Sequence, residues 1–211
     1  MLVHMGICGI GLGHASRSAT VARVLLKKGH KLSITAYGEA IKYLEREGLN
    51  PIPNIRLYYG LSDDGSVSVK RTIMNNLTLP LKFGMQVAKE ASIVDALKPN
   101  VVYSDTRAST VAAAKALGLP VLTVLNQYNI PVKVRRYRRL AVYVESMIQL
   151  PSLLWDRSDI IAVPDLPPPY TISSYTMNMR DRCRARLEYV GPIIQRRVVG
   201  EDEAIAVVAD A

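Results

Sequence analysis

The sequence predicts an α/β fold built around a doubly wound parallel sheet. Short apolar runs alternate with segments of helical periodicity along most of the 211 residues. Strands separated by helices form right-handed βαβ units, which produce a parallel sheet with helices on both faces. A glycine-rich turn, Gly9–Gly13, directly follows the first apolar run, where such a fold makes its first strand-to-helix connection. We detect no internal repeat.

The elements of the amino-terminal half follow from their own patterns. Leu2–Ile10 is apolar enough for a strand buried on both faces, whereas the next segment repeats its apolar residues at helical spacing and stops at Gly29. Leu61–Arg71 is rich in Ser, Asp and Gly without any period, which indicates a surface loop. This half is predicted to contain strands at Leu2–Ile10, Lys31–Ala36 and Pro51–Tyr59, and helices at Ala15–Lys28, Ala40–Glu47 and Asn75–Leu97.

The carboxyl-terminal half continues the same alternation, which makes the whole fold Rossmann-like. A Pro-rich connection, Pro164–Pro169, separates its last two strands. The predicted strands are Asn100–Ser104, Val121–Leu125, Ile160–Val163 and Leu187–Val190, and the predicted helices are Thr106–Leu117 and Lys133–Trp155.

Composition narrows the class of protein. With 49% hydrophobic residues the chain is not intrinsically disordered, and runs such as Val121–Leu125 are far shorter than the ~20 residues of a membrane span. Met1–Ile10 lacks the basic start of a signal peptide, and two cysteines, Cys8 and Cys183, make neither a metal cluster nor a disulfide framework. We therefore expect a cytoplasmic protein without a bound metal. The net charge of +9 predicts an anionic partner such as nucleic acid, anionic lipid or a phosphorylated small molecule.

The turn after the first strand, Gly9–Ser18, is the first candidate site. Ligands of doubly wound sheets bind outside the carboxyl ends of the strands. Glycines allow the backbone to approach a ligand, and the free N–H groups of a helix N-terminus suit a phosphate. His14 stands in the middle of this turn, at the mouth of the sheet. The candidate acceptor- or phosphate-binding residues here are Gly11, Gly13, Ser16 and Arg17.

A dinucleotide site is the alternative interpretation of the same turn. Gly9 and Gly11 begin the Rossmann fingerprint, but His14 stands at the third glycine position. The acidic residue expected at the end of the second strand is also missing, since that strand closes with Ala36 and Tyr37. A nucleotide-cofactor oxidoreductase therefore remains a weaker hypothesis.

Polar residues follow two further strands. Asp105 ends one of them and has two interpretations, an N-cap of the next helix or a carboxylate that orients the ring of His14 as a base. Thr106, Arg107, Asn126 and Gln127 could bind a sugar or phosphate, although the last two also suit a solvated loop. The remaining histidines, His4 and His30, we expect to be structural.

Five segments, spread in order over most of the chain, carry a resemblance to a known family. They are Gly11–Arg17, Leu25–His30, Lys98–Asp105, Ala113–Val121 and Tyr189–Ile193. Together they resemble the amino-terminal half of GT-B glycosyltransferases. The chain looks most similar to archaeal UDP-sugar transferases related to the N-acetylglucosaminyltransferase of peptidoglycan synthesis and to UDP-glucuronosyltransferases.

The resemblance implies an inverting, metal-independent transfer from a nucleotide-sugar, without a cofactor, to a lipid-linked or small-molecule acceptor held by this domain. In family members that glycosylate hydroxyls, the loop histidine is the general base and the strand-end aspartate its partner. By position these roles fall to His14 and Asp105. An acceptor that is already an anion needs no base, and His14 would then bind phosphate.

A basic amphipathic stretch opens the predicted helix Lys133–Trp155. Such a stretch can lie on an anionic membrane at the inner face of the cell, which would suit a lipid-linked acceptor, or it can simply be the solvated side of a packed helix. Nucleic acid is a weaker partner, because only 6% of the residues are aromatic and no RNA-binding motif occurs. The basic residues are Lys133, Arg135, Arg136, Arg138 and Arg139.

The resemblance also bears on length. We expect residues 1–192 to form the acceptor-binding domain and residues 193–211 to form a linker toward a carboxyl-terminal donor-binding domain, which this sequence does not contain. The chain is then either part of a longer enzyme, which we favour, or a natural subunit that pairs with a separate donor-binding chain. A non-catalytic membrane-docking subunit that recruits such a chain is the alternative function.

Overall fold

Seven strands form one all-parallel sheet in the order β3-β2-β1-β4-β5-β6-β7. The computed structural model describes residues 1–57, 79–128, 151–174, 176–177, 183 and 185–194. The strands are β1 (Leu2–Ile7), β2 (Lys31–Ala36), β3 (Pro51–Pro53), β4 (Val101–Asp105), β5 (Val121–Val124), β6 (Ile160–Val163) and β7 (Arg186–Tyr189). The predicted fold class is confirmed.

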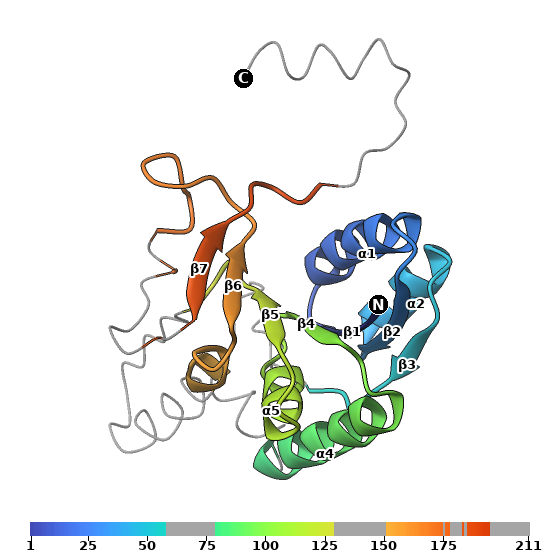
Figure 1. Ribbon diagram of the computed structural model, residues 1–211. Coiled ribbons are helices and arrows are strands. Elements are labelled where there is room, and N and C mark those ends of the chain that lie inside the picture. Colours follow the sequence, from blue (N-terminus) through green and yellow to red (C-terminus); the bar gives the residue numbers. More distant parts are fainter. Residues whose placement is uncertain (58–78, 129–150, 175, 178–182, 184, 195–211) are drawn as a thin grey trace, which may run out of the picture.

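Helices cover both faces of this sheet (Figure 1). Helices α1 (Leu12–Lys27) and α2 (Glu39–Arg46) pack together on one face, and α4 (Leu79–Leu97) and α5 (Ala108–Ala116) pack together on the other. Small residues allow the close packing of α1, whose Ala15, Ala19 and Ala22 are fully buried against the strands. A second apolar cluster, which includes the fully buried Val94 and Val111, fills the α4–α5 side.

Two predicted strands end earlier than predicted. The first strand stops at Ile7 instead of Ile10: the N–H of Cys8 still donates to the carbonyl of Asp105 on β4 (3.2 Å), and the chain then enters the glycine-rich turn. The strand predicted at Pro51–Tyr59 ends at Pro53. The next residue, Asn54, turns its side chain into a buried cluster and donates to Glu90 (2.6 Å).

Two predicted helix starts are also wrong. Helix α1 begins at Leu12, three residues earlier than predicted, so that His14 and Arg17 lie within its first two turns. Helix α5 begins at Ala108, because Thr106 has a positive φ of 54° and Arg107 is extended. The predicted loop Leu61–Arg71 and most of the predicted helix Lys133–Trp155 lie outside the described residues. Of that helix, the structure describes residues 151–155, and these are helical.

Candidate active site at the carboxyl ends of β1 and β4

The candidate site forms where the strand order reverses direction. Strands β1 and β4 are neighbours although helices and two further strands separate them in sequence, and Ile7 pairs with Asp105 at the end of their ladder. At such a switch point the connections from the two strands run to opposite faces and leave a crevice. The predicted proximity of the glycine-rich turn and Asp105 follows directly from this pairing.

Glycine is required where the turn passes the neighbouring strand. A Cβ on Gly9 would lie 1.8 Å from the carbonyl oxygen of Tyr37, at the end of β2, so no larger residue can occupy this position without moving the backbone. Gly11, the N-cap of α1, has a φ of +75°, which glycine adopts without strain. The turn therefore brings the start of α1, with His14, directly over the end of β4.

Asp105 is the centre of the site. Its side chain is fully buried, yet four surrounding side chains contact its carboxylate. Because every oxygen has a partner, the carboxylate is fixed in place. The contacts are His14 Nδ1 to Oδ1 (2.8 Å), Arg17 Nε to Oδ2 (2.7 Å), Ser18 Oγ to Oδ2 (2.8 Å), Thr106 Oγ1 to Oδ1 (3.3 Å), and a second ion-pair contact from Arg17 Nη2 to Oδ1.

The surroundings keep this buried carboxyl ionised. Burial by itself raises the pKa of Asp105, but the hydrogen bonds from Arg17 and then from His14 more than compensate, and the pKa falls below its ordinary value. The pKa of Arg17 rises correspondingly: burial opposes its charge and the contact with Asp105 outweighs that effect. Asp105 and Arg17 thus form a buried, charge-balanced pair beside the imidazole.

His14 lies between this pair and solvent. Its side chain is 22% exposed, and Nδ1 is 2.8 Å from Asp105 Oδ1 and 2.9 Å from Arg17 Nη2. In the neutral ring with the hydrogen on Nδ1, Nδ1 donates to Asp105, Arg17 Nη2 donates to Asp105 and Thr106 instead of to the ring, and Nε2 is the unprotonated nitrogen. Nε2 makes no hydrogen bond to any described residue, so it is the atom available to a ligand.

Asp105 is not the N-cap of α5, one of its two predicted roles. The N-cap is Arg107, two residues later, and its side chain makes no capping hydrogen bond. Between them Thr106 adopts φ = +54°, a conformation that is costly for a β-branched residue. Its hydroxyl reaches both Asp105 and the carbonyl of Val124 (3.2 Å). The turn directs Asp105 toward His14 instead of along the helix axis.

A cavity of about 360 Å³ opens beside this cluster. Gly13, Ser16 and Arg17 of α1 line one side, Asn126 after β5 lines another, and Pro192–Ile194 contribute apolar atoms. The volume lies in the range of small-molecule sites. The structure thus brings together seven of the predicted residues. His14, Asp105 and Thr106 lie in the cluster, Gly13, Ser16 and Asn126 line the cavity, and Arg17 belongs to both.

Other predicted site residues lie elsewhere. Arg107 is only 2% exposed and its guanidinium pairs with Glu90 on the opposite side of the sheet, so its position does not support ligand contact. Gly11 and Gln127 are exposed near the site but do not line the cavity. The basic residues predicted for a membrane surface, between 133 and 139, lie outside the described residues.

Two residues of α1 contact Asp105, a role that the sequence did not assign to them. Arg17, expected to bind phosphate, makes its ion pair with Asp105, and Ser18, expected only as a further donor in the turn, is buried and donates to the same carboxylate. Both stand three or four residues after His14 on α1, a spacing that places side chains on one helix face. That spacing was the feature of the sequence that could have placed Arg17 and Ser18 beside His14.

Metal and membrane features were searched in the described part of the chain. It contains no group of three or more His, Cys, Asp or Glu side chains that could hold a metal ion. None of its helices is both long and apolar enough to cross a bilayer.

Fold and site together define the class of protein. A seven-stranded parallel sheet carries a histidine–aspartate pair at its switch point, on a glycine-rich turn, as expected for the amino-terminal half of a GT-B glycosyltransferase. The profile of the family described as "Glycosyl transferase family 1" matches residues 1–185. The chain belongs to this family.

Similar proteins agree with this assignment. A protein of Methanosarcina acetivorans curated as "Uncharacterized glycosyltransferase" is 30% identical over 209 residues, which cover 93% of this chain and 52% of that protein. Among solved structures, the glycosyltransferase of kitacinnamycin matches with a TM-score of 0.59 at 14% identity, over 94% of this chain and 53% of that one. Spinosyn rhamnosyltransferase SpnG matches with a TM-score of 0.51 at 14% identity, over 78% and 45%. The chain spans about half the length of the relatives it matches.

Proposed function

We propose that this chain is the acceptor-binding half of an inverting, metal-independent glycosyltransferase that moves a sugar from a UDP-sugar to a hydroxyl group of a lipid-linked or small-molecule acceptor. The observation that carries the proposal is the contact of 2.8 Å between His14 and the buried Asp105, beside a cavity large enough for a sugar. Family membership supports the reaction class.

In the proposed reaction His14 removes the acceptor proton. The acceptor oxygen attacks the anomeric carbon, the bond from that carbon to the nucleotide diphosphate breaks, and the diphosphate leaves with the electron pair. The hydroxyl proton passes to Nε2 of His14, while Nδ1 donates to Asp105. A positioned base of this kind accelerates a reaction typically ~10²–10⁴-fold.

Asp105 and Arg17 fix the position of the His14 ring. The two-point contact of Arg17 keeps the carboxylate ionised and prevents its rotation, so Oδ1 stays opposite Nδ1 of His14. The negative charge of Asp105 also stabilises the imidazolium that forms when the proton arrives, as in other histidine–aspartate pairs. No step in this scheme calls for a metal ion.

The nucleotide-sugar is proposed to bind mainly outside this chain. The relatives are about twice as long, which supports a carboxyl-terminal half that binds the nucleotide, present in the same chain or as a separate subunit. Arg17 and Asn126, which line the cavity, would then contact the sugar and phosphate groups of the bound nucleotide-sugar.

The test is sugar transfer by a two-half enzyme. This chain would be joined to the carboxyl-terminal half of the M. acetivorans relative and incubated with radiolabelled UDP-sugars and a panel of hydroxyl acceptors, with each half alone as a control. We expect transfer from at least one UDP-sugar by the joined protein only. If the joined protein binds UDP and transfers nothing, while NAD(H) or NADP(H) raises the Tm of this chain, the oxidoreductase hypothesis replaces this one.

A further inference from the structure

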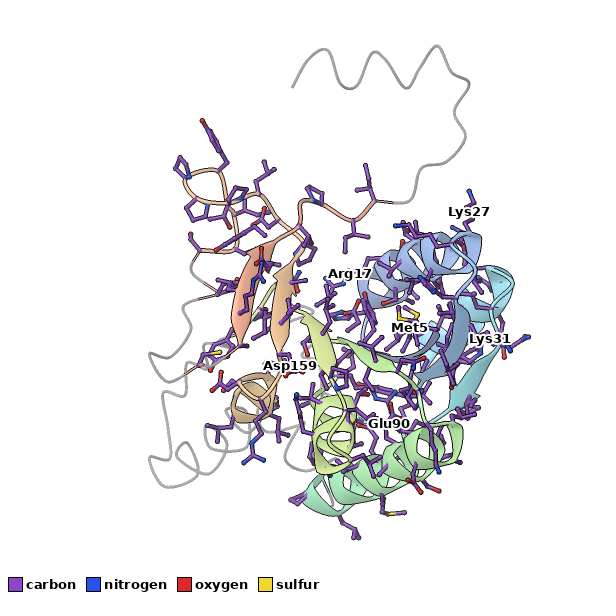
Figure 2. All side chains as sticks on the ribbon, in the orientation of Figure 1. Met5, Arg17, Lys27, Lys31, Glu90 and Asp159 are labelled. Atoms are coloured by element: carbon purple, nitrogen blue, oxygen red, sulfur yellow. The ribbon has the colours of Figure 1, made fainter. Side chains whose placement is uncertain are left out.

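A second charged cluster lies between the sheet and α4, centred on Glu90 (Figure 2). The carboxylate of Glu90 is fully buried, and five side chains from five different parts of the chain contact it. They are His4 Nε2 (3.0 Å), Thr35 Oγ1 (2.8 Å) and Thr110 Oγ1 (2.8 Å) at Oε1, and Arg107 Nη2 (2.8 Å) and Asn54 Nδ2 (2.6 Å) at Oε2.

Arg107 connects this cluster to the turn that follows β4. Its Nη2 pairs with Glu90 and its Nη1 donates to the carbonyl of Thr35 (3.1 Å), so the guanidinium is held from two sides. Its main chain is held as well, because its carbonyl accepts the hydroxyl of Ser104 (2.9 Å) and caps the start of α5. Arg107 therefore fixes the exit of the turn Asp105–Arg107.

That turn contains the strained residue of the site. Thr106, with φ = +54°, keeps a left-handed conformation that is costly for a β-branched residue and that persists only where the surroundings determine it. Arg17 and Ser18 hold the turn at Asp105, and Glu90 holds it at Arg107. Releasing either end would let Thr106 relax and would rotate Asp105 away from His14.

We propose that Glu90 is a positioning residue, which acts through Arg107 to fix the turn that carries Asp105 and hence the carboxylate oxygen facing His14. Isolated buried ion pairs seldom add net stability, because desolvation offsets their attraction, so geometry is the better reason for this one. The inference rests on the proposed function, in which His14 and Asp105 handle the acceptor proton.

The test reads the imidazole of His14 directly in the 211-residue chain. The chain has three histidines, so a ¹⁵N-histidine spectrum shows three rings, and H14Q and H30Q assign them. The variants are E90Q, which removes the charge, E90D, which restores it on a shorter side chain, and R107K, which keeps a charge but loses the planar fork. The matched control is N54A, which also removes a hydrogen bond from Glu90 but leaves the Arg107 contact.

We expect the ¹⁵N resonances of His14 to move in E90Q and R107K, to return toward their original positions in E90D, and to stay unchanged in N54A. His4 touches Glu90 and should move in all four, whereas His30, in the turn before β2, should not move in any. If E90Q does not fold, R107K gives the same readout.

Two outcomes overturn the inference: His14 signals that stay fixed in E90Q and R107K while those of His4 move, or His14 signals that move as much in N54A. In the joined enzyme, E90Q should lower kcat by about 10–100-fold at unchanged KM, since small displacements of a catalytic group have effects of that size. Because the spectra need no activity, they decide the role of Glu90 even if the proposed transfer fails.

Discussion

Replacing Asp105 by Asn should destabilise the chain far more than the loss of an ordinary surface ion pair. The side chain is fully buried, and Arg17 donates to both of its oxygens. Asn keeps the shape but turns an N–H₂ group toward the donors of Arg17, which leaves that cation without its counter-ion. Removing one partner of a buried pair costs about 3–5 kcal/mol.

We expect the lower end of this range, about 3 kcal/mol, because the Arg17 side chain is 10% exposed and can recruit water from the cavity. For a chain of this length each kcal/mol lowers Tm by about 2–4 °C, so the predicted loss is about 6–12 °C. Urea titration and thermal unfolding followed by circular dichroism measure both quantities.

The control for this prediction is D159N. Asp159 pairs with Lys115 at the surface (2.6 Å) and its side chain is 53% exposed, so its charge should contribute at most about 1 kcal/mol. Equal losses in D105N and D159N, or a D105N protein as stable as the wild type, would refute the buried, charge-balanced pair on which the site depends.

Three further predictions concern other parts of the chain. Burial alone would raise the pKa of Glu90, but Arg107 and His4 lower it to about 2. Because an unfolded Glu titrates at about 4.3, the stability that ionised Glu90 provides is complete above about pH 4.5 and is lost as the pH falls toward 2, by up to about 1.4 kcal/mol per pH unit. In acid unfolding curves, the stability of E90Q should therefore depend less steeply on pH than that of the wild type. G9A should lower the free energy of unfolding, measured in urea, by about 3 kcal/mol, because the added Cβ would collide with the backbone of Tyr37. G13A lies in the first turn of α1 with open space around it, so it should be neutral or stabilising. Equal effects of the two variants would contradict the close approach of the turn to β2. Flotation with anionic vesicles at low salt tests the predicted basic membrane surface: binding lost when residues 133–139 lose their charge supports it, and no binding by the wild type removes it.

Much of the fold could be predicted because buried parallel strands leave a strong pattern. Lys31–Ala36 and Ile160–Val163 were predicted to the residue, since both are short runs bounded by turn residues. Boundaries failed where a contact distant in sequence takes over the backbone. Pro51–Tyr59 looked like a long strand, but the strand ends at Pro53, and the side chain of the next residue, Asn54, donates to Glu90, thirty-six residues later.

The candidate site was predictable in outline and not in detail. That His14 and Asp105 meet follows from two strand ends at one edge of a parallel sheet, and the contact is confirmed. The sequence could not show which cation pairs with Asp105, because both Arg17 and Arg107 were candidate residues at the same site. The positive φ of Thr106 turns Arg107 toward Glu90 on the other face of the sheet, which leaves Arg17 as the partner of Asp105. Glu90 was missed altogether, because an acidic residue in a long helix ordinarily lies in solvent.

The rate of sugar transfer by H14A under single-turnover conditions tests the central claim most directly. The joined two-half enzyme, its H14A variant and its D105N variant would each be mixed in excess over a radiolabelled UDP-sugar, at a saturating concentration of a hydroxyl acceptor. The proposed base predicts a loss of about 10²–10⁴-fold in H14A and a smaller but clear loss in D105N. Transfer by both variants within about twofold of the wild type would contradict the claim that His14 and Asp105 remove the acceptor proton.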